Sequence, residues 1–351
     1  MSDAPTIVTG APGWAGTNLV KALLRGIPGV PGLKQPPQRP IRCLVQKGRD
    51  ATVLRSFSSG IEIVDGDLTD PGSLPRLFDG LPGAVVYHCA GVIHPRSRVH
   101  EFFDVNSKGT GNLLTAAVRG KASRFIFLSS NSPTGVSQST DMVFDESSPY
   151  RPYLAYGISK QKAEVAVAEA GRSGTIETVI ARAPWFYGPF QPERQTRFYK
   201  MIKTGRIPVA GAGNNLRSLV YVDNLCQGLL LCEQKTEARG RIYWLADEKP
   251  YTMNQIIDTA AEVMEDEFHL AVKRGRISLP SLAGDLAYAA DRLIQGLGFY
   301  SQEIHVMGEM NKTIVCSIAR AKQELGYLPG VGLREGTVRS LEWLMASGVS
   351  I

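Results

Sequence analysis

Short apolar segments alternate with longer amphipathic segments through the first half of the chain. Segments with the length and composition of buried strands lie at residues 6–8, 41–46, 61–64, 84–89, 124–128 and 177–181. Apolar positions recur at helical spacing between some of these strands, at residues 17–25, 102–118 and 154–170. Strands that alternate with helices are typical of parallel sheets, so the pattern predicts an α/β fold with a Rossmann-type, doubly wound parallel sheet.

The rhythm changes after residue 184. The segment 185–217 is rich in glycine, proline and arginine, and mainly helical patterns follow from about residue 250. We therefore expect two domains: a Rossmann domain of residues 1–184, to which 218–248 return, and a smaller, mainly C-terminal domain of 185–217 and 249–351.

Three glycines separate the first predicted strand from the first predicted helix. Gly10, Gly13 and Gly16 have the spacing G-x-x-G-x-x-G, and Trp14 and Ala15 lie inside it. In such a turn the glycines permit a tight bend, close approach of the backbone to a pyrophosphate, and close packing of helix on strand. The free N–H groups of the helix then face the phosphates. The context predicts a dinucleotide site that includes these five residues.

The end of the second strand bears on the choice of dinucleotide. An acidic residue there would bind the ribose 2′-hydroxyl of NAD, whereas basic residues accommodate the 2′-phosphate of NADP. The chain has no acid at this point, and Lys47 and Arg49 follow. This favours NADP over NAD, although both cations are equally compatible with an ordinary solvated loop.

Further cofactor contacts are expected at the ends of the third and fourth strands. Asp67, followed by Leu68, has a carboxylate that could accept the adenine amino group or cap the next helix. Cys89, Ala90 and Gly91 follow the fourth strand and would let the cofactor pass close to the backbone.

Asn106 is an unfavourable residue for the interior of the predicted helix 102–118. It is therefore expected to bind a backbone carbonyl or a water in a proton relay beside the cofactor.

Tyr156 and Lys160 lie four residues apart in the predicted helix 154–170. The spacing places them on one helix face, where the ammonium group can stabilise the phenolate and lower the phenol pKa from about 10. Such a phenol is a general acid/base for an alcohol or carbonyl oxygen. Tyr199 and Lys203 repeat the spacing, so only the surrounding motifs favour the first pair.

Two serines close the fifth strand, at the sheet edge where open α/β sheets bind ligands. Ser129 and Ser130 precede Tyr156 by 27 and 26 residues. Serines at strand ends also serve as turn formers. This separation in sequence from the Tyr–Lys pair favours a functional role for the serines, in which a hydroxyl donates to a substrate oxygen.

Composition and charge narrow the classes of function that remain possible. A net charge of +6 with scattered basic residues is compatible with an anionic ligand but does not indicate nucleic-acid binding. The five dispersed cysteines and five histidines have no metal-ligand spacing, and the cysteine pattern suits reduced thiols. We expect no metal, no signal peptide and no membrane span, and a cytoplasmic location.

Residues 279–298 are apolar, but acidic and basic residues interrupt them, which favours a core or lid helix over a membrane-touching one.

Over residues 6–250 the chain resembles the extended short-chain dehydrogenase/reductases, the NAD-dependent epimerase/dehydratase family. The resemblance rests on the glycine loop, on Asp65-Gly-Asp67, on Asn106 with Gly109-Thr110, on the strand that ends at Ser130, on Tyr156-Gly-Ile-Ser-Lys160, on Pro184 with Tyr187-Gly-Pro189, and on Arg217 ahead of Val220-Tyr-Val-Asp223. It implies that Ser130, Tyr156 and Lys160 are catalytic, that Lys160 also binds the nicotinamide ribose, and that Pro184 lies beside the nicotinamide. It also implies a homodimer, for which helices 102–118 and 154–170 are candidates.

The resemblance leaves the substrate open. Asn131-Ser132 stand where the sugar 4,6-dehydratases of this group have an Asp-Glu pair, which argues against dehydration. Six basic residues between 190 and 217 favour a diphosphate, so our first expectation is a nucleotide-sugar epimerase or ketoreductase with Arg217 and His94 at the substrate. The aromatic run 185–187 instead resembles enzymes of hydrophobic alcohols and ketones, of the 3β-hydroxysteroid dehydrogenase or dihydroflavonol reductase type. A protein that binds NAD(P) as a sensor or scaffold without turnover is the alternative of another class.

Overall fold

The computed structural model describes residues 3–137, 139, 141–349 and 351. Its centre is a seven-stranded sheet in the order β11-β6-β5-β4-β1-β2-β3, in which every neighbouring pair is parallel. The strands are β1 (Thr6–Thr9), β2 (Ile41–Val45), β3 (Ile61–Asp65), β4 (Val85–His88), β5 (Arg124–Ser130), β6 (Glu177–Ala183) and β11 (Ile242–Trp244). The predicted α/β fold with a Rossmann-type sheet is confirmed.

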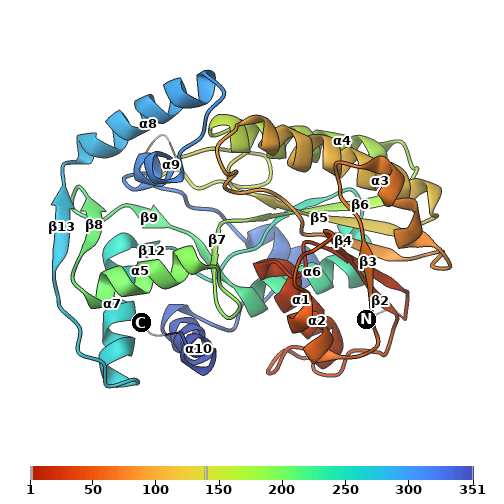
Figure 1. The fold of residues 1–351 in the computed structure, drawn as a ribbon, viewed down its shortest axis with the longest axis horizontal. Coiled ribbons are helices and arrows are strands. Elements are labelled where there is room, and N and C mark those ends of the chain that lie inside the picture. Colours follow the sequence, from red (N-terminus) through yellow and green to blue (C-terminus); the bar gives the residue numbers. More distant parts are fainter. Residues whose placement is uncertain (1–2, 138, 140, 350) are drawn as a thin grey trace.

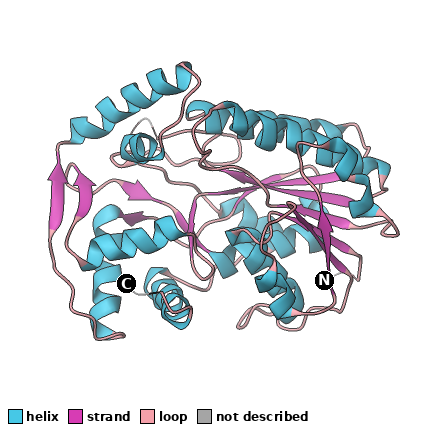
Figure 2. Cartoon of the chain, in the orientation of Figure 1, coloured by secondary structure: helices cyan, strands magenta, loops and turns pink. Residues whose placement is uncertain are grey.

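Helices cover both faces of this sheet (Figures 1 and 2). One face carries α3 (Thr110–Arg119) and α4 (Leu154–Arg172), and the other carries α1 (Trp14–Arg25), α2 (Thr52–Phe57) and α6 (Val222–Gln234). Ile7 belongs to the apolar core under α3 and α4, whereas its neighbour Val8 belongs to the core under α1 and α6. Because the strands are buried on both faces, they read as continuous apolar runs in the sequence.

The second part of the molecule follows the end of β6 and lies beside the carboxyl ends of the strands (Figure 1). Short strands pair there: β7 (Trp185–Tyr187) with β10 (Leu219–Tyr221), β8 (Ile207–Ala210) with β13 (Arg276–Leu279), and β9 (Leu216–Arg217) with β12 (Tyr251–Thr252). The helices are α5 (Glu193–Lys203), α7 (Met253–Asp266), α8 (Ser281–Gly296), α9 (Gln302–Glu309) and α10 (Leu333–Ala346). Residues 218–222 also read as a strand in the sequence and contain β10, whereas the other short strands give too short a pattern to be predicted.

Helix α8 turns its leucines outward. Leu286 and Leu293 are 63% and 72% exposed, whereas Asp291 is fully buried and Gln295 is 8% exposed. The apolar stretch that contains α8 was expected to be a core or lid helix, and the structure instead directs its polar side toward the protein. None of the described helices is long and apolar enough to cross a membrane.

A buried ion pair ties α4 to the sheet. Glu164 and Arg182 are 0% and 1% exposed, and Nη2 of the arginine donates to Oε2 of the glutamate over 2.7 Å. Ser129 Oγ and Tyr150 Oη also donate to this carboxylate, at 2.6 and 2.8 Å. Ser129 is therefore engaged in the structure of the sheet edge.

We expect Glu164→Gln to lower the free energy of unfolding by about 3–5 kcal/mol, because it leaves the Arg182 charge buried without a counter-ion. Glu335→Gln is the matched control, since its pair with Arg339 is exposed and such pairs contribute about 0–1 kcal/mol. Urea unfolding of both variants measures the difference. Equal losses in the two variants would contradict the structural role of the buried pair.

Candidate active site

The glycine loop brings the β1–α1 turn against the end of β4. Gly10 has φ +85°, and a Cβ built there would lie 2.5 Å from the backbone nitrogen of Ala90. A Cβ at Gly16 would lie 2.5 Å from the carbonyl oxygen of Gly10, so the third glycine lets α1 pack on the turn. No side chain caps the N-terminus of α1 at Gly13. The free N–H groups and the close backbone approach fit the pyrophosphate of a dinucleotide.

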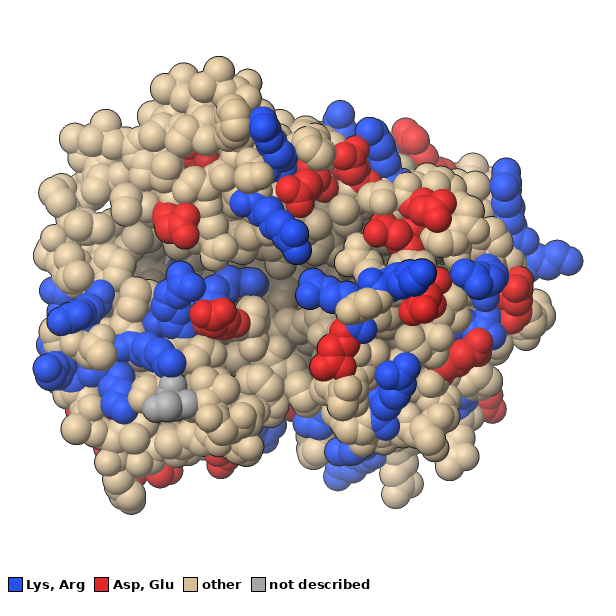
Figure 3. All heavy atoms as spheres, in the orientation of Figure 1, with Lys and Arg blue, Asp and Glu red and all other residues tan. Residues whose placement is uncertain are grey.

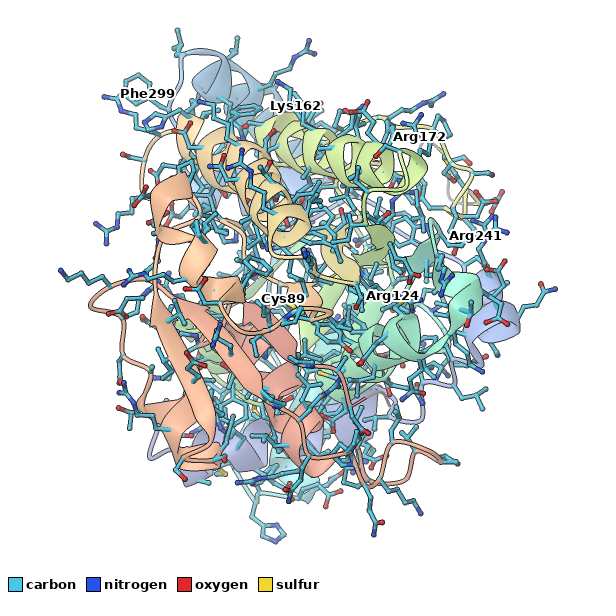
Figure 4. The ribbon with its side chains drawn as sticks, turned by 90° about the vertical axis from the view of Figure 1, so that its right-hand side faces the viewer. Cys89, Arg124, Lys162, Arg172, Arg241 and Phe299 are labelled. Atoms are coloured by element: carbon cyan, nitrogen blue, oxygen red, sulfur yellow. The ribbon has the colours of Figure 1, made fainter. Side chains whose placement is uncertain are left out.

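A cleft of about 1050 Å³ runs from this loop across the carboxyl ends of β1, β4 and β5 to the second part of the molecule. The space-filling view shows the hollow, with lysine and arginine side chains gathered along it (Figure 3). Cys89, labelled beside the sheet in Figure 4, is half-buried at the end of β4. The predicted site residues that line the cleft are Gly10, Gly13, Trp14, Ala15, Asp67, Leu68, Cys89, Ala90, Gly91, His94, Ser130, Tyr156, Lys160 and Pro184.

Three predicted cofactor residues, Gly16, Lys47 and Asn106, do not line the cleft, and the role of Gly16 is the packing of α1 described above. Lys47 is exposed, and Arg49 lines the cleft in its place. Asn106 is buried in a π-helical segment, Phe102–Gly109, where its Oδ1 accepts from the Val92 N–H at 2.7 Å and its Nδ2 donates to the Val92 carbonyl at 2.9 Å. Asn106 therefore fixes the loop after β4, as the expected backbone contact.

Arg217 is 1% exposed and does not line the cleft. Its guanidinium lies 4.4 Å from the ring centroid of Trp185 and donates to the carbonyl of Glu309. Trp185 and Glu309 both line the cleft, so Arg217 supports the wall from behind. A role for Arg217 at the substrate stays a prediction.

Burial opposes the ionisation of Tyr156. Burial raises its pKa to about 12, although a hydrogen bond to Ser130 acts in the opposite direction. Glu309 raises this pKa further, and Arg194 lowers it. The expected lowering of the phenol pKa by Lys160 is absent from this structure, because burial dominates. Tyr156 is therefore protonated at neutral pH, as an acid that reduces a carbonyl must be.

Lys160 lies one turn further along α4 and is 4% exposed. Its Nζ donates to the Leu128 carbonyl at 2.8 Å and lies 4.2 Å from the ring centroid of Phe127. Burial lowers its pKa to about 8, while the charge of Glu164 opposes the shift.

The Ser130 hydroxyl is hydrogen-bonded to Tyr156, and its other side-chain contacts are weak. Its distances to Asn131 Oδ1 and Ser132 Oγ are 3.5 and 3.4 Å, long for O–H···O bonds. Both serines line the cleft, but the Ser129 hydroxyl is engaged with Glu164, so Ser130 is the serine whose hydroxyl adjoins Tyr156.

Asp67 has local partners at the adenine end of the cleft. Burial would raise its pKa, but hydrogen bonds from Thr69 and Gln46 lower it overall. The Thr69 N–H donates to Oδ1 at 2.8 Å and Gln46 Nε2 donates to Oδ2 at 3.0 Å. The next helical turn is instead capped by Asp70, so Asp67 does not have the helix-capping role considered as its alternative. Gln46, at the end of β2, thus takes the place between the two strands where an acid would bind a ribose.

The second Tyr–Lys pair is structural. Tyr199 is 2% exposed in the apolar core formed with α7 and α10. Lys203 Nζ donates to the carbonyl of Ile351 at 2.7 Å. Tyr199 also lines the cleft, but its ring packs in this core and Lys203 is bound to the C-terminus.

The cleft wall near Tyr156 includes two residues that sequence reasoning missed, His305 and Glu309, beside Arg194, one of the six basic residues noted above, and the predicted His94. His305, Glu309 and Arg194 line the cleft, and His94 Nδ1 lies 2.6 Å from Tyr300 Oη. Burial and neighbouring positive charges lower the pKa of His94 to about 3. The sequence feature that could have indicated this wall is Asp291, an acidic residue in the middle of an apolar helix. Among the described residues, no group of three or more His, Cys, Asp or Glu could hold a metal ion.

The family model described as "NAD dependent epimerase/dehydratase family" matches residues 6–246. The chain belongs to this family. Its members are NAD(P)-dependent enzymes with the Rossmann-type sheet seen here. A Sinorhizobium fredii protein named "Uncharacterized protein y4nL" is 46% identical over 350 residues, which cover 99% of this chain and 97% of that protein.

Relatives with named activities are more distant. The 2-alkyl-3-oxoalkanoate reductase of Shewanella oneidensis is 25% identical over 298 residues, or 80% of this chain and 74% of the relative. UDP-glucose 4-epimerase of Vibrio cholerae is 25% identical over 346 residues, which cover 94% of this chain and 92% of the relative. The structure of a dTDP-glucose 4,6-dehydratase from Streptomyces venezuelae matches with a TM-score of 0.74 at 23% identity, over 97% of this chain and 96% of the other, which supports the fold.

Proposed function

We propose that this protein is an NAD(P)-dependent oxidoreductase that interconverts a secondary alcohol and a ketone on a substrate with an apolar body. The apolar lining of the substrate half of the cleft carries the proposal. That lining includes Trp185, Phe186, Met201, Val306, Met307 and Met310. Methionine and aromatic side chains adapt to apolar ligands and offer few hydrogen bonds to a sugar. The reductase of 2-alkyl-3-oxoalkanoates among the relatives points in the same direction.

In this proposal Tyr156, Ser130 and Lys160 handle the proton. Ser130 donates to the substrate oxygen and holds it near Tyr156, which gives its proton to that oxygen as the carbonyl is reduced and takes it back in the reverse reaction. Lys160 binds the nicotinamide ribose and stabilises the phenolate that forms. The bound nicotinamide supplies or accepts the hydride. The buried walls exclude water from the reacting carbon.

The cofactor would lie along the glycine loop, with Pro184 beside its nicotinamide and Asp67 at its adenine. We propose a preference for NADP, because Gln46 replaces the acid at the end of β2 and Arg49 lines the cleft there. The Rossmann domain of residues 1–184 and 218–248 would hold the cofactor, and the remainder would hold the substrate. A homodimer through α3 and α4 is supported by Ile158 and Val165, which are 37% and 38% exposed on α4.

A nucleotide sugar is the second candidate substrate. Arg194 and Arg197 line the cleft, and arginine matches diphosphate geometry well. The UDP-glucose 4-epimerase among the relatives aligns with 94% of this chain. Dehydration is not part of either proposal, because Asn131 and Ser132 offer no acid/base pair beside Tyr156.

Turnover with straight-chain ketones of increasing length tests the proposal. We expect NADPH oxidation, faster than with NADH, with KM falling about fourfold per added methylene until the cleft is full, since each buried methylene contributes about 0.8 kcal/mol. Tyr156→Phe is the background control. Turnover of UDP-glucose without any response to ketone chain length would replace this proposal by the sugar candidate. Binding of NADPH without turnover of either class would favour a sensor or scaffold.

A further inference from the structure

A histidine held by a buried carboxylate stands in the wall of the cleft opposite Tyr156. His305 Nδ1 lies 2.7 Å from Asp291 Oδ2, and Gln295 Nε2 donates to the other oxygen of Asp291 at 2.9 Å. His305 is 5% exposed and lines the cleft. A carboxylate at Nδ1 fixes the ring orientation and leaves Nε2 for another partner.

Nε2 of His305 has no hydrogen bond in the part of the chain that the structure describes. The closest carboxylate oxygen recorded for it, Glu309 Oε1, is 3.8 Å away, beyond hydrogen-bond distance. Aromatic rings hold the imidazole in place, with centroids of Tyr153 and Tyr300 at 5.6 and 5.5 Å. Phe102 bridges this group to the reacting side, at 5.4 Å from Tyr300 and 5.7 Å from Tyr156. The ring is fixed at one nitrogen and available at the other, within the same chamber as Tyr156.

Burying Asp291 and His305 together costs free energy, which is unusual for a contact with a purely structural role. Helix α8 buries Asp291 completely and exposes its leucines, the reverse of an ordinary amphipathic helix. Burial alone would lower the pKa of His305, but the hydrogen bond to Asp291 and the charges of Glu309 and Asp291 raise it above 6.5. The imidazole is therefore cationic more often than a free histidine. With Arg194 and Arg217 it gives this region three positive groups against the carboxylates of Asp291 and Glu309.

We propose that Nε2–H of His305 binds a carboxylate of the substrate while Tyr156 and Ser130 bind the reacting oxygen. The substrate class is then a hydroxy or oxo acid with an apolar chain. The inference rests on the proposed function and deepens it. His305 is a specificity-determining residue at the second anchor point, and Asp291 is the positioning residue that holds its ring. A single imidazolium with one arginine matches a carboxylate better than a phosphate, which needs more donors.

Charged and titratable groups from several elements surround His305. Asp291 on α8 and Glu309 on α9 face it directly, and Arg217 on β9 and Arg194 on α5 lie behind or beside them. His94 is neutral because its pKa is lowered to about 3, and the pKa values of Tyr153 and Tyr300 are raised. Lys160 also titrates, with a pKa of about 8, but it acts on acids and neutral ketones alike. Loss of carboxylate affinity as pH rises above the His305 pKa is thus specific to His305.

The test compares a medium-chain 3-oxo acid with its carboxamide in the full-length enzyme with NADPH. His305→Asn keeps a donor toward Asp291 and removes Nε2. We expect it to lower kcat/KM for the acid by about 10- to 100-fold, since hydrogen bonds to charged groups are the stronger ones, and for the amide by less than about threefold. His305→Gln should restore part of the loss. His100→Asn, at an exposed histidine outside the cleft, is the matched control.

The pH profile gives a second readout. For the acid, KM should rise with pH in the wild-type enzyme and stay flat in His305→Asn, with thermal unfolding used to verify that both are folded. Equal losses for acid and amide, or no preference for the acid in the wild type, would overturn the assignment. If neither compound turns over, the proposed function fails on its own. In that case, calorimetry of binding to the protein–NADP⁺ complex still tests the assignment of His305. The substitution His305→Asn must then weaken the binding of the acid and leave the binding of the amide unchanged.

Discussion

Tyr156→Phe is expected to lower kcat by about 10²- to 10⁴-fold, the contribution typical of a positioned general acid. The phenol is buried, and burial raises its pKa to about 12, so its proton is present at neutral pH and only the hydroxyl is lost in the variant. Affinity for NADP⁺ should change by less than about threefold, because the phenyl ring keeps its contact with Phe102. Steady-state kinetics and cofactor titration measure the two quantities.

Tyr199→Phe is the matched control for this variant. Tyr199 repeats the four-residue spacing to a lysine, yet it is packed in a core with α7 and α10 and its lysine contacts the C-terminus. Its kcat should stay within about twofold of wild type, since no role in proton transfer is lost. Similar turnover in both variants would rule out Tyr156 as the proton donor.

The sequence predicted the parallel sheet and the position of the glycine loop, for reasons visible in the structure. Strands buried on both faces read as continuous apolar runs, and the glycine spacing is imposed by contacts of the turn with Ala90 and of α1 with Gly10. The contact of α1 with Gly10 is local in sequence, whereas the contact with Ala90 joins the turn to β4. Tyr156 and Lys160 likewise share one helix, so their common face follows from spacing alone.

The substrate half depends on contacts between distant segments, which spacing does not reveal. Asp291 and His305 belong to different helices, and only the packing of α9 against α8 brings them together. Arg217 was a reasonable candidate for a diphosphate by its charge, but burial behind Trp185 keeps it off the cleft wall. The pKa of Tyr156 was expected to fall because the spacing reveals the proximity of Lys160 but does not reveal the burial of the phenol.

The second large effect is expected from Gly10→Ala, which addresses how closely the β1–α1 turn approaches β4. A Cβ at this position would lie 2.5 Å from both the nitrogen of Ala90 and the carbonyl carbon of Cys89, and these are backbone atoms that cannot rotate away. The turn or the end of β4 must then move. We expect a loss of about 3 kcal/mol or more in the free energy of unfolding, from the clash and the positive φ together. The Kd for NADP⁺ should rise at least about 100-fold, because the displaced backbone lies on the pyrophosphate path.

Gly29→Ala separates the two causes. Gly29 has φ +81°, close to that of Gly10, but a Cβ there meets nothing within 4 Å. It should therefore cost only the conformational strain of an alanine at positive φ, about 1–2 kcal/mol, and leave the Kd for NADP⁺ unchanged. Urea unfolding and a fluorescence titration of both variants give the comparison. If Gly10→Ala were as mild as Gly29→Ala, positive φ alone would explain the first glycine, and the close approach to β4 would not be what the cofactor site requires of it.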